Sequence, residues 1–385
     1  MSVVADDLTG AADCGIAFAL AGLPTFVALT EGEVPGAARV VAFDTGTRAL
    51  PAEAAAQRTE AAVRRAYAEG TRHLYKKIDS TLRGQVGPET AAALRAAREA
   101  RGSAVAIAAP AFPALGRTMR DGRILVEGDP LEETEVWHKS GMSGRADLRA
   151  MLETAGLRVA IVGPGEEPPA GVDAAVCDAA SDEDLRRIAG MGARLEGAVI
   201  WVGSGGLARH LPEALGLRPQ EDRLRIQKRP GPVLTLIGSR SSISREQAQR
   251  LCAGPGALCI ELSPGELLQR SDLPEARRAL DAGQDVTLLI GLGEVDLEAA
   301  LPLAAALGRL AAPLTGAAAG VIATGGDIAR GLLAGLGSSG LWMAGEVEPG
   351  VPLGFTDARL PLITKAGAFG DPQTLVRCRA ALRSS

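Results

Sequence analysis

Two acidic residues stand directly after the first candidate strand of the chain. Asp6 and Asp7 follow the apolar run 2–5 and precede a helical stretch. In open α/β sheets the ligand crevice lies outside the carboxyl ends of the strands, so one of these carboxylates can face a ligand there. A crevice carboxylate can accept a hydrogen bond from a hydroxyl group, take its proton or hold Mg²⁺. Capping of the helix by Asp7 or Thr9 is the alternative, and the residues alone leave both open.

A second polar loop combines cations with carboxylate and hydroxyl groups. The sequence KKIDSTLRG occupies 76–84, where the β-rich run 73–77 ends, and it holds two of the chain's five lysines. An arginine such as Arg83 can hold a carboxylate through two hydrogen bonds, while Asp79 and Ser80 can bind hydroxyl groups. Together with Lys77, these residues favour a site for a small polyhydroxy carboxylate. An Asp79–Arg83 ion pair that only closes the turn is the alternative.

A glycine-rich turn follows the run 198–202. Its sequence GSGGLA, at 203–208, matches the G-x-G-x-x-A pattern of dinucleotide sites. The match is incomplete, because Glu221 and Asp222 fall in a charged, proline-containing stretch and not at the end of a following strand. A helix that begins near Gly205 would still favour an anion at its N-terminus. The pattern therefore leaves open an NAD(P)-dependent oxidoreductase, and equally a tight turn without a ligand.

Three further polar or glycine-rich loops each follow a β-rich run in the C-terminal half. They are GSRSS at 238–242, TGGD at 324–327 and KAGAFG at 365–370. Glycines let backbone N–H groups approach phosphates closely, and a following helix adds its positive end. Three such loops in one domain predict a nucleotide crevice. The sequence contains no G-x-x-x-x-G-K-[ST], so this crevice is not a P-loop.

Alternating β-rich and helical runs must position these loops, and this alternation is typical of parallel α/β sheets. The candidate strands lie at 2–5, 25–29, 39–43, 73–77, 104–108, 158–162, 173–177, 198–202, 233–237, 257–261, 286–290, 320–323 and 361–364. The candidate helices lie at 51–69, 88–100, 182–194 and 244–253. Ser244 and Gln247 have the spacing of a capping box at the start of the last helix.

The length of 385 residues predicts two domains, because a single core rarely grows past ~250–300 residues. The charged stretch around 221–231 is the predicted linker. It divides an N-terminal domain at 1–220 from a C-terminal domain at 232–385. Each domain is expected to be a mostly parallel sheet flanked by helices.

Composition excludes several classes of protein. The net charge of −5 argues against a nucleic-acid-binding surface. No run of ~20 apolar residues lacks charges, so we expect no membrane span. The five cysteines form no C-x-x-C pair and are odd in number, which favours reduced thiols and a cytoplasmic location. The three histidines lack metal-ligand spacing, and Ser204 lies in no G-x-S-x-G motif.

The motifs together resemble the four-carbon acid sugar kinase family, whose members phosphorylate threonate, erythronate or 3-oxo-tetronate. The resemblance runs in order along nearly the whole chain, through ADDLTGAAD, KKIDSTLRG, APAFPALGRT, EGDPLEETE, TGGD, GEVEPGVPLG and TKAGAFG. It implies two α/β domains, with the acid sugar held by the N-terminal one, ATP and Mg²⁺ by the C-terminal one, and the active site in the cleft between them. It implies no nucleic-acid or membrane partner and leaves a homo-oligomer open.

The resemblance and the polar loops together predict roles for individual residues. Asp7, as base or orienter of the attacking hydroxyl, and Arg83 would be catalytic. The substrate site would include Asp6, Lys77, Asp79, Ser80 and Gly205. The nucleotide site would include Ser239, Ser241, Thr324, Gly325, Gly326, Asp327, Ile328, Lys365, Gly367 and Gly370. The family commonly has Thr or Ser where Ile328 stands, and it does not identify the metal ligands. A non-catalytic sugar-acid-binding regulator and the oxidoreductase are the rival functions.

Overall fold

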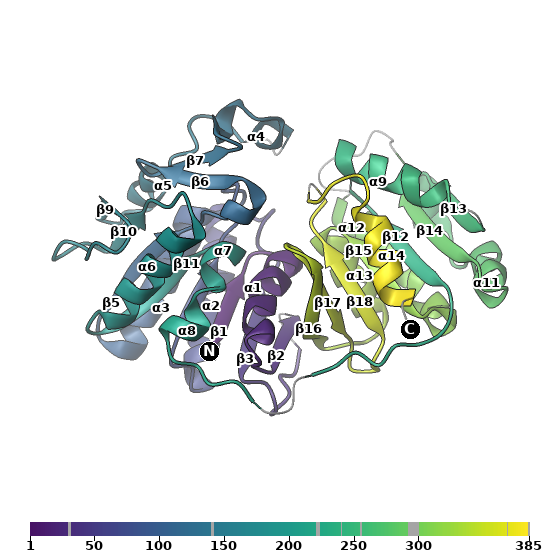
Figure 1. Ribbon diagram of the computed structural model, residues 1–385, viewed down its shortest axis with the longest axis horizontal. Helices are drawn as coiled ribbons and strands as arrows, with labels where there is room; N and C mark the ends of the chain where they lie inside the picture. Colours follow the sequence, from purple (N-terminus) through teal and green to yellow (C-terminus); the bar gives the residue numbers. More distant parts are fainter. Residues whose placement is uncertain are drawn as a thin grey trace. The chain divides into compact units, whose positions relative to one another are not determined.

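The computed structural model describes residues 1–29, 32–139, 142–220, 224–239, 241–254, 256–291, 300–367 and 369–383. The chain forms two compact units, shown in Figure 1. The first unit is Met1–Thr25 with Ala37–Asp222, and the second is Phe26–Gly36 with Arg223–Ser385. Residues Phe26–Gly36 therefore belong to the second unit, although the predicted boundary at residue 220 placed them in the N-terminal domain. The predicted linker starts at 221–223, which lie outside the described residues.

The sheet of the first unit is parallel, in the order β3-β1-β4-β11-β5-β10-β9. Its strands are β1 (Ser2–Ala5), β3 (Val40–Asp44), β4 (Leu74–Lys77), β5 (Ala104–Ala109), β9 (Val159–Val162), β10 (Ala174–Cys177) and β11 (Ala198–Gly203). All residues of β1, β4 and β10 are buried, as expected for strands covered on both faces. Each of the seven lies within one residue of a predicted strand.

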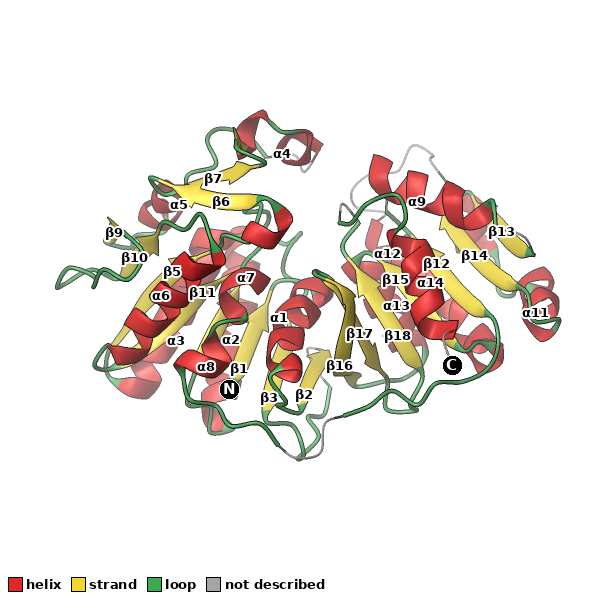
Figure 2. Cartoon of the chain, in the orientation of Figure 1, coloured by secondary structure: helices red, strands yellow, loops and turns green. Residues whose placement is uncertain are grey.

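Helices cover both faces of this sheet (Figure 2). On one face, α1 (Leu8–Leu20) and α6 (Asp182–Arg194) pack against the short α7 (Gly205–Ala208), which is followed by α8 (Leu211–Ala214). On the other face, α2 (Ala52–Ala68), α3 (Val86–Arg101) and α5 (Leu148–Thr154) pack together. The predicted helices 51–69, 88–100 and 182–194 are confirmed to within two residues at each end.

A small antiparallel sheet follows β5 and was not predicted. It consists of β6 (Arg117–Arg120), β7 (Arg123–Val126) and β8 (Asp129–Pro130), followed by α4 (Glu135–Lys139). Met119 of β6 forms an isolated bridge with Ala179, just beyond the carboxyl end of β10. The hairpin therefore lies at the same edge of the main sheet as the loops that follow β1 and β4. Its strands are too short to give a clear periodic pattern.

The sheet of the second unit begins with parallel strands in the order β13-β14-β12-β15-β18 and continues with antiparallel β17-β16-β2. The parallel strands are β12 (Val233–Ile237), β13 (Ala257–Leu262), β14 (Asp285–Ile290), β15 (Gly320–Thr324) and β18 (Pro361–Lys365). The antiparallel ones are β2 (Thr25–Leu29), β16 (Gly340–Glu348) and β17 (Val351–Phe355). Both units are thus mostly parallel α/β structures, while the β16–β17 hairpin was not predicted.

Two layers of helices enclose this second sheet. On one face, α9 (Ser242–Cys252) packs against α14 (Thr374–Arg383). On the other face lie α10 (Pro264–Gln269), α11 (Pro274–Asp281), α12 (Ala300–Ala311) and α13 (Gly326–Gly335). The backbones of α12 and α13 approach closely, because a Cβ at Gly308 would lie 2.1 Å from the carbonyl carbon of Gly331.

The predicted capping box at Ser244 and Gln247 is wrong. The helix α9 begins two residues earlier, and Ser241 is its N-cap, accepting a hydrogen bond from the backbone N–H of Ser244. The pattern failed because serines occupy 241, 242 and 244, and each can cap a helix. Ser244 and Gln247 instead direct their side chains to the loop after β18, as described below.

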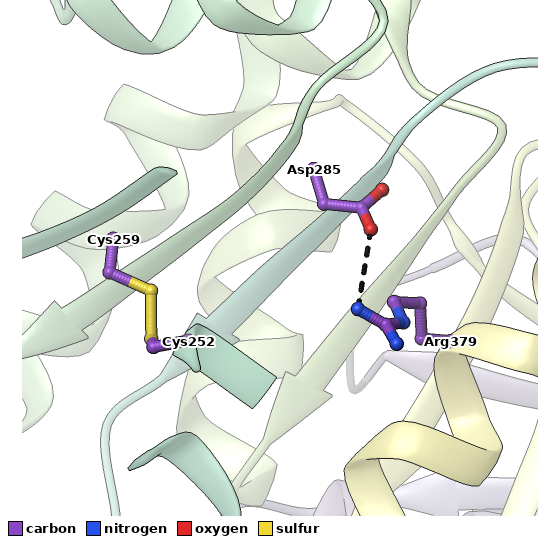
Figure 3. The surroundings of a disulfide bond; sticks show 4 residues. All are labelled: Cys252, Cys259, Asp285 and Arg379. Atoms are coloured by element: carbon purple, nitrogen blue, oxygen red, sulfur yellow. Dashed lines mark ion pairs between the residues drawn. A yellow bond between two sulfur atoms is a disulfide. The ribbon is translucent and has the colours of Figure 1, made fainter. Parts of the chain in front are cut away.

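The expectation of five reduced thiols is also wrong, because Cys252 and Cys259 form a disulfide (Figure 3). Cys252 ends α9 and Cys259 lies in β13, and the packing of α9 on β13 brings their Cα atoms to 5.9 Å. That distance is within the range that a disulfide needs. These cysteines are seven residues apart and form no C-x-x-C pair, so no local motif indicates their pairing. Cys14, Cys177 and Cys378 are free and buried.

Candidate active site

Adjacent parallel strands bring the first two polar loops together. Ala5 of β1 and Lys77 of β4 are register partners, so Asp6 and Asp7 emerge beside the loop 78–84. On the other side of β1, Ala5 is the register partner of Asp44 in β3, which places the residues after β3 at the same edge. We call Asp6, Asp7, Arg48, Lys77, Asp79 and Arg83 the charged cluster.

Arg48, which the sequence analysis did not single out, joins the two aspartates. Its guanidinium donates to both carboxylate oxygens of Asp6, at 2.7 and 2.9 Å, and to both of Asp7, at 2.7 and 2.8 Å. Burial alone would raise the pKa of Asp6, but Arg48 and Lys77 outweigh burial and hold that pKa below its usual value. The signal that could have found Arg48 is its place just after the candidate strand 39–43.

Asp7 also caps α1, so the helix-capping role that the sequence left open for Asp7 is present in the structure. Its Oδ1 accepts from the backbone N–H of Gly10 at 2.8 Å, and its Oδ2 accepts from the Thr9 hydroxyl at 2.6 Å. With the two bonds from Arg48, each oxygen accepts two hydrogen bonds. A carboxylate has about four acceptor positions, so those of Asp7 are filled by the protein itself.

The two adjacent lysines lie in contrasting surroundings. The Lys76 ammonium is fully buried and pairs with Glu89 at 2.9 Å. The Lys77 side chain is also buried, yet within the described part of the chain its ammonium makes no hydrogen bond or ion pair. It lies against the first turn of α1, because a Cβ at Gly10 would be 2.5 Å from Lys77 Nζ. Burial lowers the pKa of Lys77, but Asp6 and Asp7 outweigh burial and raise it, which keeps the group charged.

The loop 78–84 is held by the predicted ion pair. Arg83 donates to both oxygens of Asp79, at 2.7 and 3.0 Å, so the ion-pair alternative is present in the structure. Burial opposes ionisation of Asp79, but Arg83 and Arg48 hold its pKa well below the usual range. Ser80 accepts a hydrogen bond from buried Arg117, at 2.8 Å. Arg117 begins β6, so the unpredicted hairpin brings a further cation to this loop.

The glycine-rich turn at 203–208 serves a tight packing contact. Ser204 caps the four-residue helix α7, and Tyr75 donates to the Ser204 carbonyl at 2.5 Å. A Cβ at Gly205 would lie 2.4 Å from a carboxylate oxygen of Asp13, so glycine is needed where α1 approaches this turn. The chain continues from α7 into α8 and not into a strand, which differs from the βαβ unit of a dinucleotide site.

In the second unit, three neighbouring strands bring the other loops together. The ends of β12, β15 and β18 are aligned by the register pairs Ile237–Thr324 and Thr324–Lys365. We call the segments 238–241, 324–327 and 365–371 the loop cluster, of which Arg240 and Ala368 lie outside the described residues. Its loops contact each other, because the Gly325 N–H donates to the Lys365 carbonyl at 2.8 Å.

The loop after β18 is fixed by side chains of α9 and its N-cap. The hydroxyls of Ser241 and Ser244 both donate to the Gly367 carbonyl, at 2.8 and 2.6 Å. Gln247 donates from its Nε2 to the carbonyls of Phe369 and Asp371, at 3.1 and 2.7 Å. A Cβ at Gly367 would lie 2.1 Å from the Ser239 hydroxyl oxygen. A side chain at this position would therefore force Ser239 or the loop to shift.

The loop 324–327 leads directly into α13. Gly325 has a φ of 100°, and α13 begins at the next residue, with Asp327 in its first turn. The side chain of Ile328 is buried and packs toward Gly238, where an added Cβ would be 2.4 Å from Ile328 Cδ1. Its side chain is therefore a packing element, and only its backbone N–H can serve a ligand. The first N–H groups of a helix lack partners within the helix and attract anions.

Within the described residues, no group of three or more His, Cys, Asp or Glu side chains could hold a metal ion. Among the helices in those residues, none has the length and apolarity needed to cross a membrane.

Comparison with known proteins gives matches along nearly the whole chain. Residues 1–211 match a family described as a sugar-binding N-terminal domain, and residues 234–375 match a nucleotide-binding C-terminal domain. A D-threonate kinase of Cupriavidus necator is 40% identical, covering 100% of this chain and 98% of that protein. A D-threonate kinase of Bordetella bronchiseptica is 35% identical, covering 100% and 97%. A crystal structure from Salmonella typhimurium LT2 shares the fold, with a TM-score of 0.77, 22% identity and coverage of 99% and 98%.

Proposed function

Because the chain belongs to the four-carbon acid sugar kinase family and is an ATP-dependent kinase of these acids, we propose that its substrate is D-threonate. The observation that carries this proposal is the identity of 40% and 35% to two D-threonate kinases that match the whole chain. The reaction transfers the terminal phosphoryl group of ATP to a hydroxyl of the acid and serves carbohydrate metabolism. Because the reaction consumes ATP, we also propose that the protein acts in the cytoplasm.

Lys77 and Arg83 are the proposed ligands of the substrate carboxylate. Lys77 is supported by its buried, charged ammonium, which makes no hydrogen bond or ion pair in the described structure. Asp6 and Asp7 keep this ammonium charged, and its N–H donors remain open for a bound carboxylate. Arg83 uses its Nε and one Nη on Asp79, which leaves its other Nη for the ligand. Asp6, Asp79, Ser80 and Gly205 complete the proposed acid site.

We propose that Asp7 supports the attacking hydroxyl electrostatically and orients it by exchanging one present hydrogen bond, such as that from the Thr9 hydroxyl, for one from the substrate. All four acceptor positions of its carboxylate receive hydrogen bonds from Thr9, Gly10 and Arg48. Phosphoryl transfer needs positioning and charge neutralisation more than strong base catalysis, so the orienting role is sufficient.

The loop cluster is the proposed nucleotide site. Backbone N–H groups at Gly326, Ile328, Gly367 and Gly370 and the side chain of Ser239 would bind the phosphates. The Gly325 N–H and the buried Thr324 hydroxyl, both expected there, already donate to the carbonyls of Lys365 and Leu236. The side chains of Ser241 and Lys365, both expected at this site, instead donate hydrogen bonds to carbonyls of the loop after β18.

The residues of the loop cluster also fit a nucleotide-bound Mg²⁺. This ion usually takes one or two protein carboxylates and completes its shell with phosphates and water. Asp327 could provide such a carboxylate, and no dedicated cage of acidic residues is needed. When bound, Mg²⁺ neutralises the phosphate charge. In-line transfer requires the γ-phosphate of ATP bound to the second unit to reach the hydroxyl of the acid bound to the first. We therefore propose an active site in the cleft between the two units.

A substrate screen tests the proposed function. Purified protein is incubated with ATP, Mg²⁺ and each stereoisomer of threonate and erythronate, or with 3-oxo-tetronate, and ADP release is followed. We expect the highest kcat/KM with D-threonate, and NMR of the product identifies the phosphorylated hydroxyl. If kcat/KM is higher with erythronate or 3-oxo-tetronate, then that acid and not D-threonate is the substrate. Stabilisation by NADH without any by ATP, in a thermal-shift titration, would favour the oxidoreductase instead.

A further inference from the structure

Among the described residues of the loop cluster, Lys365 is the one cation, and its side chain points into the protein. It is the last residue of β18 and is fully buried. Its Nζ donates to the carbonyls of Ala366, Gly367 and Phe369, at 2.9, 3.1 and 3.0 Å. An ammonium group has three N–H donors, so the loop uses all of them. No donor of Lys365 is left for a phosphate.

The orientation of these carbonyls determines where the neighbouring N–H groups lie. The described chain contains no cis peptide bond, and in a trans peptide the N–H points opposite to the C=O of the same unit. The carbonyls of Ala366 and Phe369 are turned toward Lys365, so the N–H groups of Gly367 and Gly370 are directed away from it. Neither of these N–H groups donates a hydrogen bond within the described residues.

Lys365 also connects this loop to the loop 324–327. Its own carbonyl accepts from the Gly325 N–H at 2.8 Å, one residue before α13 begins. In addition, Gln247 of α9 donates to the Phe369 carbonyl at 3.1 Å. The loop is therefore fixed from inside by a cation and from α9 by a neutral amide.

We propose that Lys365 is a positioning residue of the nucleotide site, which fixes the carbonyls of its loop so that the N–H groups of Gly367 and Gly370 face the phosphates. This inference rests on the proposed binding of the nucleotide by the loop cluster. It differs from the role of a phosphate-binding lysine, because the ammonium acts through the loop and never contacts the ligand.

The protonation state of Lys365 gives the proposal a pH dependence. Burial lowers the pKa of Lys365 to about 8, against the opposing influence of Cys378 on α14 and Glu348 at the end of β16. Above this pH the neutral amine has two N–H donors and a lone pair, so it can no longer satisfy three carbonyls. Nucleotide affinity should therefore be full below about pH 8 and fall as the pH rises through that value.

Direct titration of Mg·ADP tests this role without any acid substrate, so a wrong assignment of D-threonate does not affect the result. Calorimetry at pH 7.5 and pH 9.5 compares the wild type with Lys365→Met and Gln247→Ala. We expect the wild-type Kd to rise about tenfold at the higher pH, equivalent to ~1.4 kcal/mol. Lys365→Met should bind about tenfold more weakly at pH 7.5 and show no change between the two pH values. Gln247→Ala should bind more weakly but keep the pH dependence.

Three outcomes would overturn the positioning role. The first is wild-type affinity in Lys365→Met, and the second is a pH dependence that persists in that variant. The third is full affinity in Gln247→Ala combined with a loss in Lys365→Met, which would place the ammonium on the phosphates. If Lys365→Met does not fold, Gln247→Ala still decides the question, because full nucleotide affinity in that variant contradicts the need for a fixed loop geometry. If Mg·ADP does not bind to any form, it is the proposed nucleotide site that fails.

Discussion

The charged cluster and the loop cluster lie at corresponding places, beyond the carboxyl ends of neighbouring parallel strands, but they are built from different chemical groups. The charged cluster consists of ionised side chains, with Arg48 and Arg83 bound to three aspartates at 2.7–3.0 Å. The loop cluster consists of glycines, hydroxyls and backbone groups, and its one described lysine is turned inward.

This difference corresponds to the two ligands that the clusters are proposed to bind. A small sugar acid offers one carboxylate and a few hydroxyls, so recognition needs a few charged groups in fixed positions. A triphosphate offers many oxygens and arrives with Mg²⁺, so many backbone N–H groups suit it without added protein charge. Substitutions should therefore act through charge in the first unit and through backbone geometry in the second.

The largest expected effect separates the two adjacent lysines. Lys77→Met should lower kcat/KM for the acid by about 10²–10³, because it removes the partner of the substrate carboxylate. The KM for ATP should change little, since ATP is proposed to bind the other unit. Lys76→Met should instead lower the free energy of unfolding by ~3–5 kcal/mol, because it leaves Glu89 buried without its ion-pair partner. Steady-state kinetics and denaturant unfolding of both variants measure this contrast.

A reversed pattern would contradict the assignment of the two lysines. If Lys77→Met unfolds as easily as Lys76→Met and loses affinity for both substrates, then Lys77 is a structural residue. The Arg64–Glu99 pair provides a matched control, because both side chains are more than half exposed. Arg64→Met should leave both stability and kinetics nearly unchanged, because solvent screens an exposed ion pair.

A smaller effect is expected for Asp7→Asn. We expect kcat to fall by about 10- to 100-fold. The loss of a general base would lower kcat by ~10²–10⁴. The amide would place a donor against Arg48 or Gly10 and disturb the cap of α1, at a cost of ~1–3 kcal/mol of stability. A fall near 10⁴ with unchanged KM would make Asp7 the general base, whereas a change confined to KM would remove it from the chemistry.

The sequence predicted the loops of both clusters because local patterns determine them. Polar or glycine-rich turns that follow β-rich runs predicted functional loops at 6–7, 76–84, 238–242, 324–327 and 365–370. In the structure each of these five segments begins at or directly after the end of a strand. Family resemblance then assigned roles that geometry alone would have left open. The parallel strands were predicted because their buried apolar runs have a clear signal.

The remaining features depend on contacts between distant segments. Arg48 joins the charged cluster only because β3 lies next to β1, and strand order is not written in any local pattern. The disulfide depends likewise on the packing of α9 on β13. Lys365 was assigned to the nucleotide because lysines bind phosphate, but the direction of its side chain is a property of the folded loop. Sequence indicates which groups are present, and tertiary packing determines which of them are already used.

A still smaller effect tests the backbone character of the loop cluster. Gly367→Ala should raise the KM for ATP about tenfold, because its Cβ would lie 2.1 Å from the Ser239 hydroxyl oxygen and must displace the loop. The KM for the acid should not change. Gly316→Ala is the control, since an added Cβ there meets nothing within 4 Å and no positive φ is required. Equal kinetics for both variants would show that the loop after β18 does not contact the nucleotide.

The smallest effect on activity is expected from removing the disulfide, which occurs in the unit without the charged cluster. Cys252→Ser with Cys259→Ser should lower the stability of the second unit by about 2 kcal/mol, because the cross-link restrains a short loop of the unfolded chain. The kcat should stay within about twofold of wild type, since the residues of α9 that hold the loop are Ser244 and Gln247 at its other end. Thermal unfolding with and without reductant measures the first effect. A large rise in the KM for ATP on reduction would instead mean that the whole of α9, and not only its first turns, sets the geometry of the loop cluster.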